Sequence, residues 1–188
     1  MNMRHISATM DAAKSYKARG WATALVEFGG KAPSMAVRGP HNIAVVLGSA
    51  SGHLADVDLD DPIAIKLAPQ FLPATLTFGR GGEVRHMLFR AKDAPTHRYT
   101  DATDKKTLVE LRANSSTGVG MQVVVPPSIH PSGQRVEWMG GDEPAEVDAV
   151  WLHAQVCALA AAVLDAKHGE GNAAVAEQRA KWLSQVQL

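Results

Sequence analysis

The pattern of the chain changes at Pro144, and this change constrains the fold more than any other feature. Before Pro144, short β-branched or aromatic runs are separated by glycine- and proline-rich breaks, which is typical of strands joined by turns. The runs 43–47 and 53–59, connected through turn residues 48–52, predict a β-hairpin. A helix is expected from Ser7 or Thr9 to about Arg19. The remaining expectations are a loop over 31–41, a short helix over 62–67, and strands at 21–28, 75–78, 84–89, 107–112 and 121–125.

After Pro144 the sequence becomes helical. Pro144 suits a first helical turn, apolar residues recur behind it at helical spacing, and Gly169 ends the pattern. A second helix is expected over 173–186, with Trp182 on its apolar side. The sequence therefore predicts an α+β core over 1–143, followed by a helical pair over 144–188.

Length and composition indicate one domain with a small appendage. The 188 residues are 46% hydrophobic and 20% charged, which suits a folded core and argues against wholesale disorder. No run approaches the ~20 apolar residues that span a bilayer, and the first residues lack the apolar centre of a secretory signal. A single cysteine, Cys157, excludes a disulfide framework and is expected to be a buried, inert thiol. We therefore expect a soluble, cytoplasmic protein.

The charge of the chain is balanced overall but uneven locally. Nineteen basic residues oppose nineteen acidic ones, so the whole chain carries no nucleic-acid signature. The segment from Arg80 to Arg112 holds eight basic and five acidic residues. This segment is either a local anion-binding surface or a solvated face.

The segment 55–61, with the sequence ADVDLDD, carries the sharpest chemical signal. On a strand, residues two apart face the same way, so Asp56 and Asp58 project from one face and Asp60 can extend the row beyond the strand. Adjacent carboxylates repel unless a cation lies between them, and Mg²⁺ accepts such oxygen ligands. The segment is therefore either a metal site or an acidic strand end that faces water.

Three further segments carry candidate functional residues. Glu110 is an acidic residue in a strand-like run, either on a solvent face or in a site. His86 follows a glycine-rich loop that holds Arg80, and Arg85 adjoins it, so the segment suits phosphate binding or a simple hairpin turn. The stretch 125–133, with the sequence VPPSIHPSG, presents Ser128 and His130 either as positioned donors or within a rigid turn.

Several common sites are excluded by spacing. The glycine-containing segment 48–52 lacks the Gly-Lys-Ser/Thr ending of a P-loop, and no G-x-G-x-x-G opens a helix. The chain also contains neither a G-x-S-x-G elbow nor an H-E-x-x-H zinc motif.

The order of these segments resembles the bifunctional DNA primase/polymerase (Prim-Pol) domain of the archaeo-eukaryotic primase superfamily, which is common in phage and plasmid replication proteins. The resemblance covers about residues 8 to 140. It rests on Arg-Gly-Trp, Gly-Gly-Lys-Ala-Pro, the run NIAVVLGSASG leading into Asp56-Val-Asp58, then His86, Glu110 and the run VPPSIHPSG.

The resemblance implies a template-directed nucleotidyl transferase with a primase catalytic core, in which a two-layer sheet related to the RNA-recognition motif packs with helices. It implies that Asp56, Asp58 and Glu110 hold Mg²⁺ or Mn²⁺. It further implies that His86, with Arg80 or Arg85, binds the incoming triphosphate, that Ser128 and His130 lie beside the nucleotide, and that Lys31 lies near the edge. A DNA template, nucleoside triphosphates and a separate helicase are the implied partners.

One departure from the family pattern keeps two alternatives open. The family's second motif has a serine near the histidine, whereas this chain has Val84-Arg85-His86. Arg85 either takes over a phosphate contact or the site is weakened, which would leave a non-catalytic nucleic-acid or replisome module. A metal-dependent phosphodiesterase that uses the same carboxylates is the other alternative.

Overall fold

The strands form two separate antiparallel sheets in the computed structural model, which describes residues 3–28, 41–114, 121–169 and 171–186. The small sheet has the order β1-β2-β8, and the large sheet has the order β6-β7-β3-β5-β4-β9. A short strand, β10, adds to β5 in parallel. The strands of the small sheet are β1 (Thr23–Glu27), β2 (His41–Val46) and β8 (Gln122–Val124). Those of the large sheet are β3 (Leu54–Leu59), β4 (Leu76–Arg80), β5 (Glu83–Arg90), β6 (His97–Thr100), β7 (Thr107–Arg112), β9 (Glu137–Gly140) and β10 (Ala145–Glu146).

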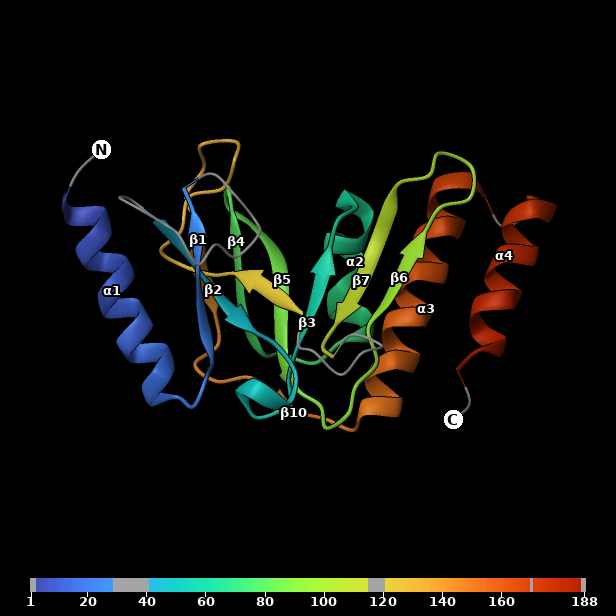
Figure 1. The fold of residues 1–188 in the computed structure, drawn as a ribbon. Helices are drawn as coiled ribbons and strands as arrows, with labels where there is room; N and C mark the ends of the chain where they lie inside the picture. Colours follow the sequence, from blue (N-terminus) through green and yellow to red (C-terminus); the bar gives the residue numbers. More distant parts are fainter. Residues whose placement is uncertain (1–2, 29–40, 115–120, 170, 187–188) are drawn as a thin grey trace.

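Helices lie at both ends of this arrangement. Figure 1 shows α1 (Met3–Ala18) beside the small sheet at one end, and α3 (Ala149–His168) and α4 (Ala173–Ser184) at the other. The fourth helix, α2 (Pro62–Phe71), packs with α3. This α+β architecture agrees with the expected primase-type core followed by a pair of helices.

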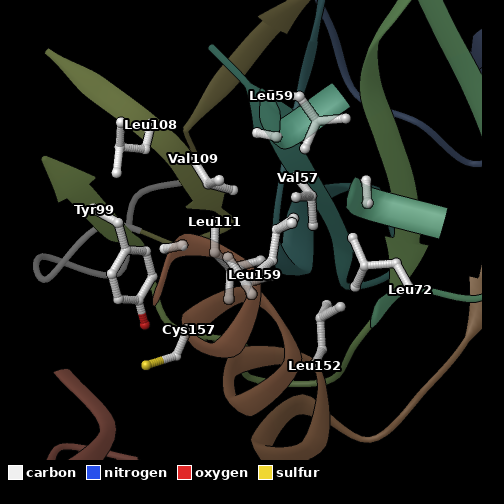
Figure 2. Packing of buried hydrophobic residues seen from close by; sticks show 14 of the residues in the cluster. Val57, Leu59, Leu72, Tyr99, Leu108, Val109, Leu111, Leu152, Cys157 and Leu159 are labelled. Atoms are coloured by element: carbon white, nitrogen blue, oxygen red, sulfur yellow. The ribbon is translucent and has the colours of Figure 1, made fainter. Parts of the chain in front are cut away.

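Each face of the large sheet packs in its own core. On one face, Val57 and Leu59 of β3 meet helices α2 and α3, and Figure 2 shows Leu152 and Leu159 of α3 in this cluster. On the other face, Leu54 and Phe78 pack toward the small sheet. Because β3 alternates, its odd-numbered residues enter the helical core and its even-numbered residues face the small sheet.

Helix α3 is the central element of the first core. Within the described part of the chain it is the one helix long and apolar enough to cross a membrane, with a mean hydropathy of 1.6. The sequence pattern predicted a helix that ends at Gly169, but not that it would be apolar enough to cross a membrane. Its buried residues pack on the sheet instead, among them Val156 and Cys157, whose thiol pKa is raised by burial. This packing is typical of the core helix of a soluble protein.

The predicted hairpin between 43–47 and 53–59 is wrong. Strand β2 pairs with β1 and β8, whereas β3 pairs with β5 and β7, so the two runs belong to different sheets. The turn residues between them instead include a 3₁₀ helix at Ser49–Ser51, and a lone bridge joins Gly48 to Leu54. The turn therefore carries the chain from one sheet to the other.

The helix after Pro144 begins later than predicted. Residues Ala145 and Glu146 are extended beside β5, and the helix starts behind Asp148, whose carboxylate accepts a hydrogen bond from the amide of Trp151 at 2.8 Å. Helix α2 in turn runs past Pro69 to Phe71, because buried Ala64 and Ala68 hold it on the sheet. The sequence pattern missed β6, β9 and β10. The predicted loop over 31–41 lies outside the described residues, except for His41, which begins β2.

Candidate nucleotide and metal site

The candidate site is built on three neighbouring strands of the large sheet. Asp58 in β3 lies directly opposite His86 in β5 on one side and Glu110 in β7 on the other. Asp56 pairs in the same way with Arg112 in β7. Directly paired residues project from the same face, so these side chains gather on the face that looks toward the small sheet.

Asp56 is the completely buried carboxylate of the group. Its Oδ2 accepts hydrogen bonds from Nη2 of Arg112 at 2.6 Å and lies 3.1 Å from Nδ1 of His86, while its Oδ1 has no partner. Burial alone would raise the pKa of Asp56, but His86 and Arg112 outweigh burial and hold the pKa below its usual value. Asp56 is therefore an ionised group that contacts both His86 and Arg112.

Asp58, Asp60 and Glu110 form a second group at the opening of the site. Their oxygen atoms lie within 4.8 Å of one another, and exposure rises from Glu110 through Asp58 to Asp60. Partial burial, and then the negative charges of Asp58 and Glu110, raise the pKa of Asp60 to about 6. Three oxygen donors that repel one another in this way fit a hard divalent cation.

Asp56, Asp58 and His86 form another group whose ligand atoms lie within 4.8 Å of one another, but this group fits a cation less well. Both aspartates of that group already face the guanidinium of Arg112, at 2.6 and 3.1 Å. A cation bound there would have to share its carboxylates with a buried positive charge. The acidic residues of this chain can therefore hold a divalent metal. In the Asp58–Asp60–Glu110 group, Asp58 faces Arg112 and Glu110 faces Arg98, and Asp60 lies outside these two ion pairs.

His86 is held in place from two directions. Its ring stacks on Phe78 with the centroids 4.4 Å apart, and its Nδ1 lies 3.1 Å from Asp56 and 3.5 Å from Asp58. A histidine whose Nδ1 is engaged by carboxylates has its orientation fixed and its Nε2 directed elsewhere.

The side chains line a hollow between the two sheets. Its floor holds Asp58, Asp60, His86 and Arg112, and its far wall is β8 with the segment Ile129–Pro131. Arg80 completes the rim where β4 ends. At Gly79 the backbone of β5 comes so close that an added Cβ would lie 1.9 Å from the carbonyl oxygen of Glu83. Arginines and a histidine beside carboxylates suit a ligand that is itself anionic and metal-bound.

The remaining predicted residues lie at different distances from this hollow. His130 lines it and contacts Ser132 through Nδ1 at 2.9 Å. Ser128 is buried, and its hydroxyl forms two hydrogen bonds with the backbone of Ile43. It accepts from the amide N at 3.0 Å and donates to the carbonyl O at 3.1 Å. Arg85 is left out of the β4–β5 pairing by a register shift and forms an ion pair with Glu83. Lys31 lies outside the described residues.

Sequence reasoning missed Arg112 and gave Asp60 too little weight. The signal for Asp60 was its spacing, because 56, 58 and 60 continue one alternation. The signal for Arg112 was its place two residues after Glu110, on the same strand face. Neither could be assigned a partner without the pairing of β3 with β7.

An α+β fold with a carboxylate cluster and cationic side chains in one hollow is typical of proteins that bind metal–phosphate ligands. The family model of the bifunctional DNA primase/polymerase N-terminal domain (Prim-Pol) matches residues 8–150. The chain therefore belongs to this DNA primase/polymerase family, whose activity is nucleotidyl transfer in DNA replication. No curated protein matches the chain.

Proposed function

We propose that this protein is a template-directed DNA primase/polymerase that adds nucleotides from (d)NTPs, in phage- or plasmid-type replication in the cytoplasm. The observation that carries the proposal is the Asp58–Asp60–Glu110 group, of which Asp58 and Asp60 line the same hollow as Arg80, His86 and Arg112. In nucleotidyl transfer the primer 3′-oxygen bonds to the α-phosphorus of the nucleotide, and the α–β bond breaks to release pyrophosphate. The triphosphate of the nucleotide is negatively charged, and the hollow that would hold it is lined by the arginines Arg80 and Arg112.

Asp58, Asp60 and Glu110 would hold the metal in this proposal. A bound Mg²⁺ or Mn²⁺ supplies neutralisation of the phosphate charge and a more acidic 3′-hydroxyl. Glu110 is itself oriented by Arg98, whose Nη2 donates to Oε1 at 3.0 Å. Catalysis of this kind depends on positioning and on electrostatic stabilisation, so the rigidity of paired strands suits it.

The triphosphate would lie on the cationic side of the hollow. His86, Arg112 and Arg80 line the same hollow and would contact the phosphates of a nucleotide bound there. In this arrangement Asp56 does not bind metal, because its charge is used to orient His86 and Arg112. Asp56 is thus a positioning residue behind the phosphate-binding groups.

The other predicted residues take smaller parts. His130 lines the hollow opposite the carboxylates and would contact the nucleotide. Ser128 would act indirectly, since its hydroxyl fastens the segment that holds His130 to β2. Roles for Arg85 and Lys31 in nucleotide binding remain predictions.

A gel assay of labelled nucleotide incorporation tests the function directly. It uses primed and unprimed single-stranded templates with Mg²⁺ or Mn²⁺, and it compares wild type with Asp58→Asn, Asp60→Asn and Asp11→Asn. We expect metal-dependent extension that each of the first two substitutions lowers by at least about 100-fold, as for loss of a group acting in the transition state. Asp11→Asn is the control, because its carboxylate is exposed on α1, where it pairs with Lys14.

The absence of serine from Val84-Arg85-His86 favours a second candidate function, a binding module that has lost catalysis. Such a module would bind template and incorporate nothing, with or without Asp58. Extension by Asp58→Asn at the wild-type rate would contradict the proposed site. Release of mononucleotides from DNA without added triphosphates would indicate a phosphodiesterase instead.

A further inference from the structure

We propose that Trp138 stacks against a base of the single-stranded DNA template and is the main contact of this protein with template bases. This inference rests on the proposed function, since it assigns a template-binding residue to the same site. Trp138 lies in β9 at the edge of the large sheet, and the residue is 39% exposed. Exposure of this kind sets it apart from Trp21 and Phe78, which are buried.

Trp138 belongs to a row of paired residues that leads straight to the carboxylates. The row runs across adjacent strands in the order Trp138, Phe78, His86, Asp58 and Glu110. Neighbouring strands lie ~4.8 Å apart, so Trp138 is about 10 Å from the position of His86 and about 14 Å from that of Asp58.

The rings in this row contact one another and fix the orientation of Trp138. Trp138 meets Phe78 edge-on at 5.5 Å, and Tyr16 of α1 approaches it edge-on at 6.1 Å. A tryptophan held by two buried neighbours, with part of its ring open to solvent, is a rigid platform that loses little entropy when a base stacks on it. Val136, two residues earlier, lines the hollow itself, so the platform adjoins the candidate site.

The charges around Trp138 favour a base over a phosphate as its ligand. The preceding residue, Glu137, is exposed and would repel a phosphate at this position. Arg80, at the end of β4, lines the hollow together with Arg112. With no nucleotide bound, we therefore expect Arg80 to contribute to the salt-dependent part of template binding, and Trp138 to contribute a part that does not depend on salt.

The test measures binding of fluorescein-labelled oligothymidylate by anisotropy in EDTA, where no nucleotide is joined. Loss of one stacked base weakens binding by about 5- to 150-fold, which we expect for Trp138→Ala. Trp138→Phe should retain most of the affinity. Trp151→Ala is the matched control, because Trp151 is 37% exposed but belongs to α3, on the opposite face of the large sheet.

Two further measurements separate stacking from a general effect on folding or charge. An abasic oligonucleotide of equal length should bind wild type as weakly as oligothymidylate binds Trp138→Ala. The slope of log affinity against log salt should be unchanged in Trp138→Ala and shallower in Arg80→Ala. Wild-type affinity in Trp138→Ala, an equal loss in Trp151→Ala, equal binding of abasic DNA, or no binding of DNA by wild type would each overturn the proposal.

The failure of this inference can be distinguished from failure of the proposed function. Base-dependent binding through Trp138 without any incorporation would leave the stacking platform standing and refute the polymerase. Nucleotide incorporation that requires Asp58, together with DNA binding that is unchanged in Trp138→Ala, would support the polymerase and refute the stacking platform.

Discussion

Asp56 and Asp58 are two residues apart on one strand face, yet their surroundings assign them different tasks. Asp56 neutralises the buried guanidinium of Arg112, whereas Asp58 also faces two other carboxylates. Removing one partner of a buried ion pair costs about 3–5 kcal/mol. We therefore expect Asp56→Asn to destabilise the protein by roughly that amount and Asp58→Asn to cost much less, as measured by urea unfolding.

In metal binding the order of the two variants should be reversed: the more stable variant, Asp58→Asn, should be the one that loses the metal. Mn²⁺ titration followed by electron paramagnetic resonance should show binding retained in Asp56→Asn and lost in Asp58→Asn, under conditions where both are folded. Loss of Mn²⁺ binding in a folded Asp56→Asn protein would restore Asp56 as a metal ligand.

At the scale of elements, helix α4 contacts the sheet through a buried aromatic pair. Trp182 is buried against Tyr99 of β6, with the ring centroids 5.1 Å apart, and joins the core that α3 forms on the sheet. Truncating a buried tryptophan costs about 3–5 kcal/mol. We expect that loss for Trp182→Ala in thermal or urea unfolding, and a change below about 1 kcal/mol for half-exposed Trp151→Ala. Equal effects would mean that α4 does not dock as the structure has it.

The pattern of neighbouring residues was enough to predict most of these helices and strands. It could not predict how the strands pair, because pairing depends on residues far apart in the sequence. The run Thr107–Arg112 was predicted with its true bounds, because an apolar β-rich run between turns depends only on neighbouring residues. The polar strand His97–Thr100 has no such pattern, and its order comes from pairing with β7. The same limit explains the site, since Asp58 and Glu110 were both singled out while their contact depends on strands 52 residues apart joining in one register.

At the scale of the whole molecule, a buried ion cluster fastens the C-terminal helices to the sheet. Asp101, in the β6–β7 connection, lies 2.7 Å from Nε2 of His168 and 3.2 Å from Nζ of Lys167, both at the end of α3. From α4, Gln178 donates to the carbonyl of Thr100 at 2.7 Å. The connection between two edge strands therefore holds both helices.

This cluster makes the stability of the protein depend on pH in a defined direction. Burial alone would raise the pKa of Asp101, but hydrogen bonds from His168, the amide of Thr103 and Lys167 outweigh it and hold the pKa well below its usual value. A carboxyl whose pKa is lower in the folded state stabilises the protein fully above its unfolded pKa of ~3.9, and that stabilisation is lost as pH falls below it. We expect Asp101→Asn to cost about 1–3 kcal/mol near neutral pH and progressively less below about pH 4, in urea unfolding at a series of pH values. Asp11→Asn is the control, because the carboxylate of Asp11 is exposed on α1. It should be as stable as wild type at every pH. A difference between wild type and Asp101→Asn that stayed constant down to low pH would mean that the charge of Asp101 does not hold the helices, and that packing alone does.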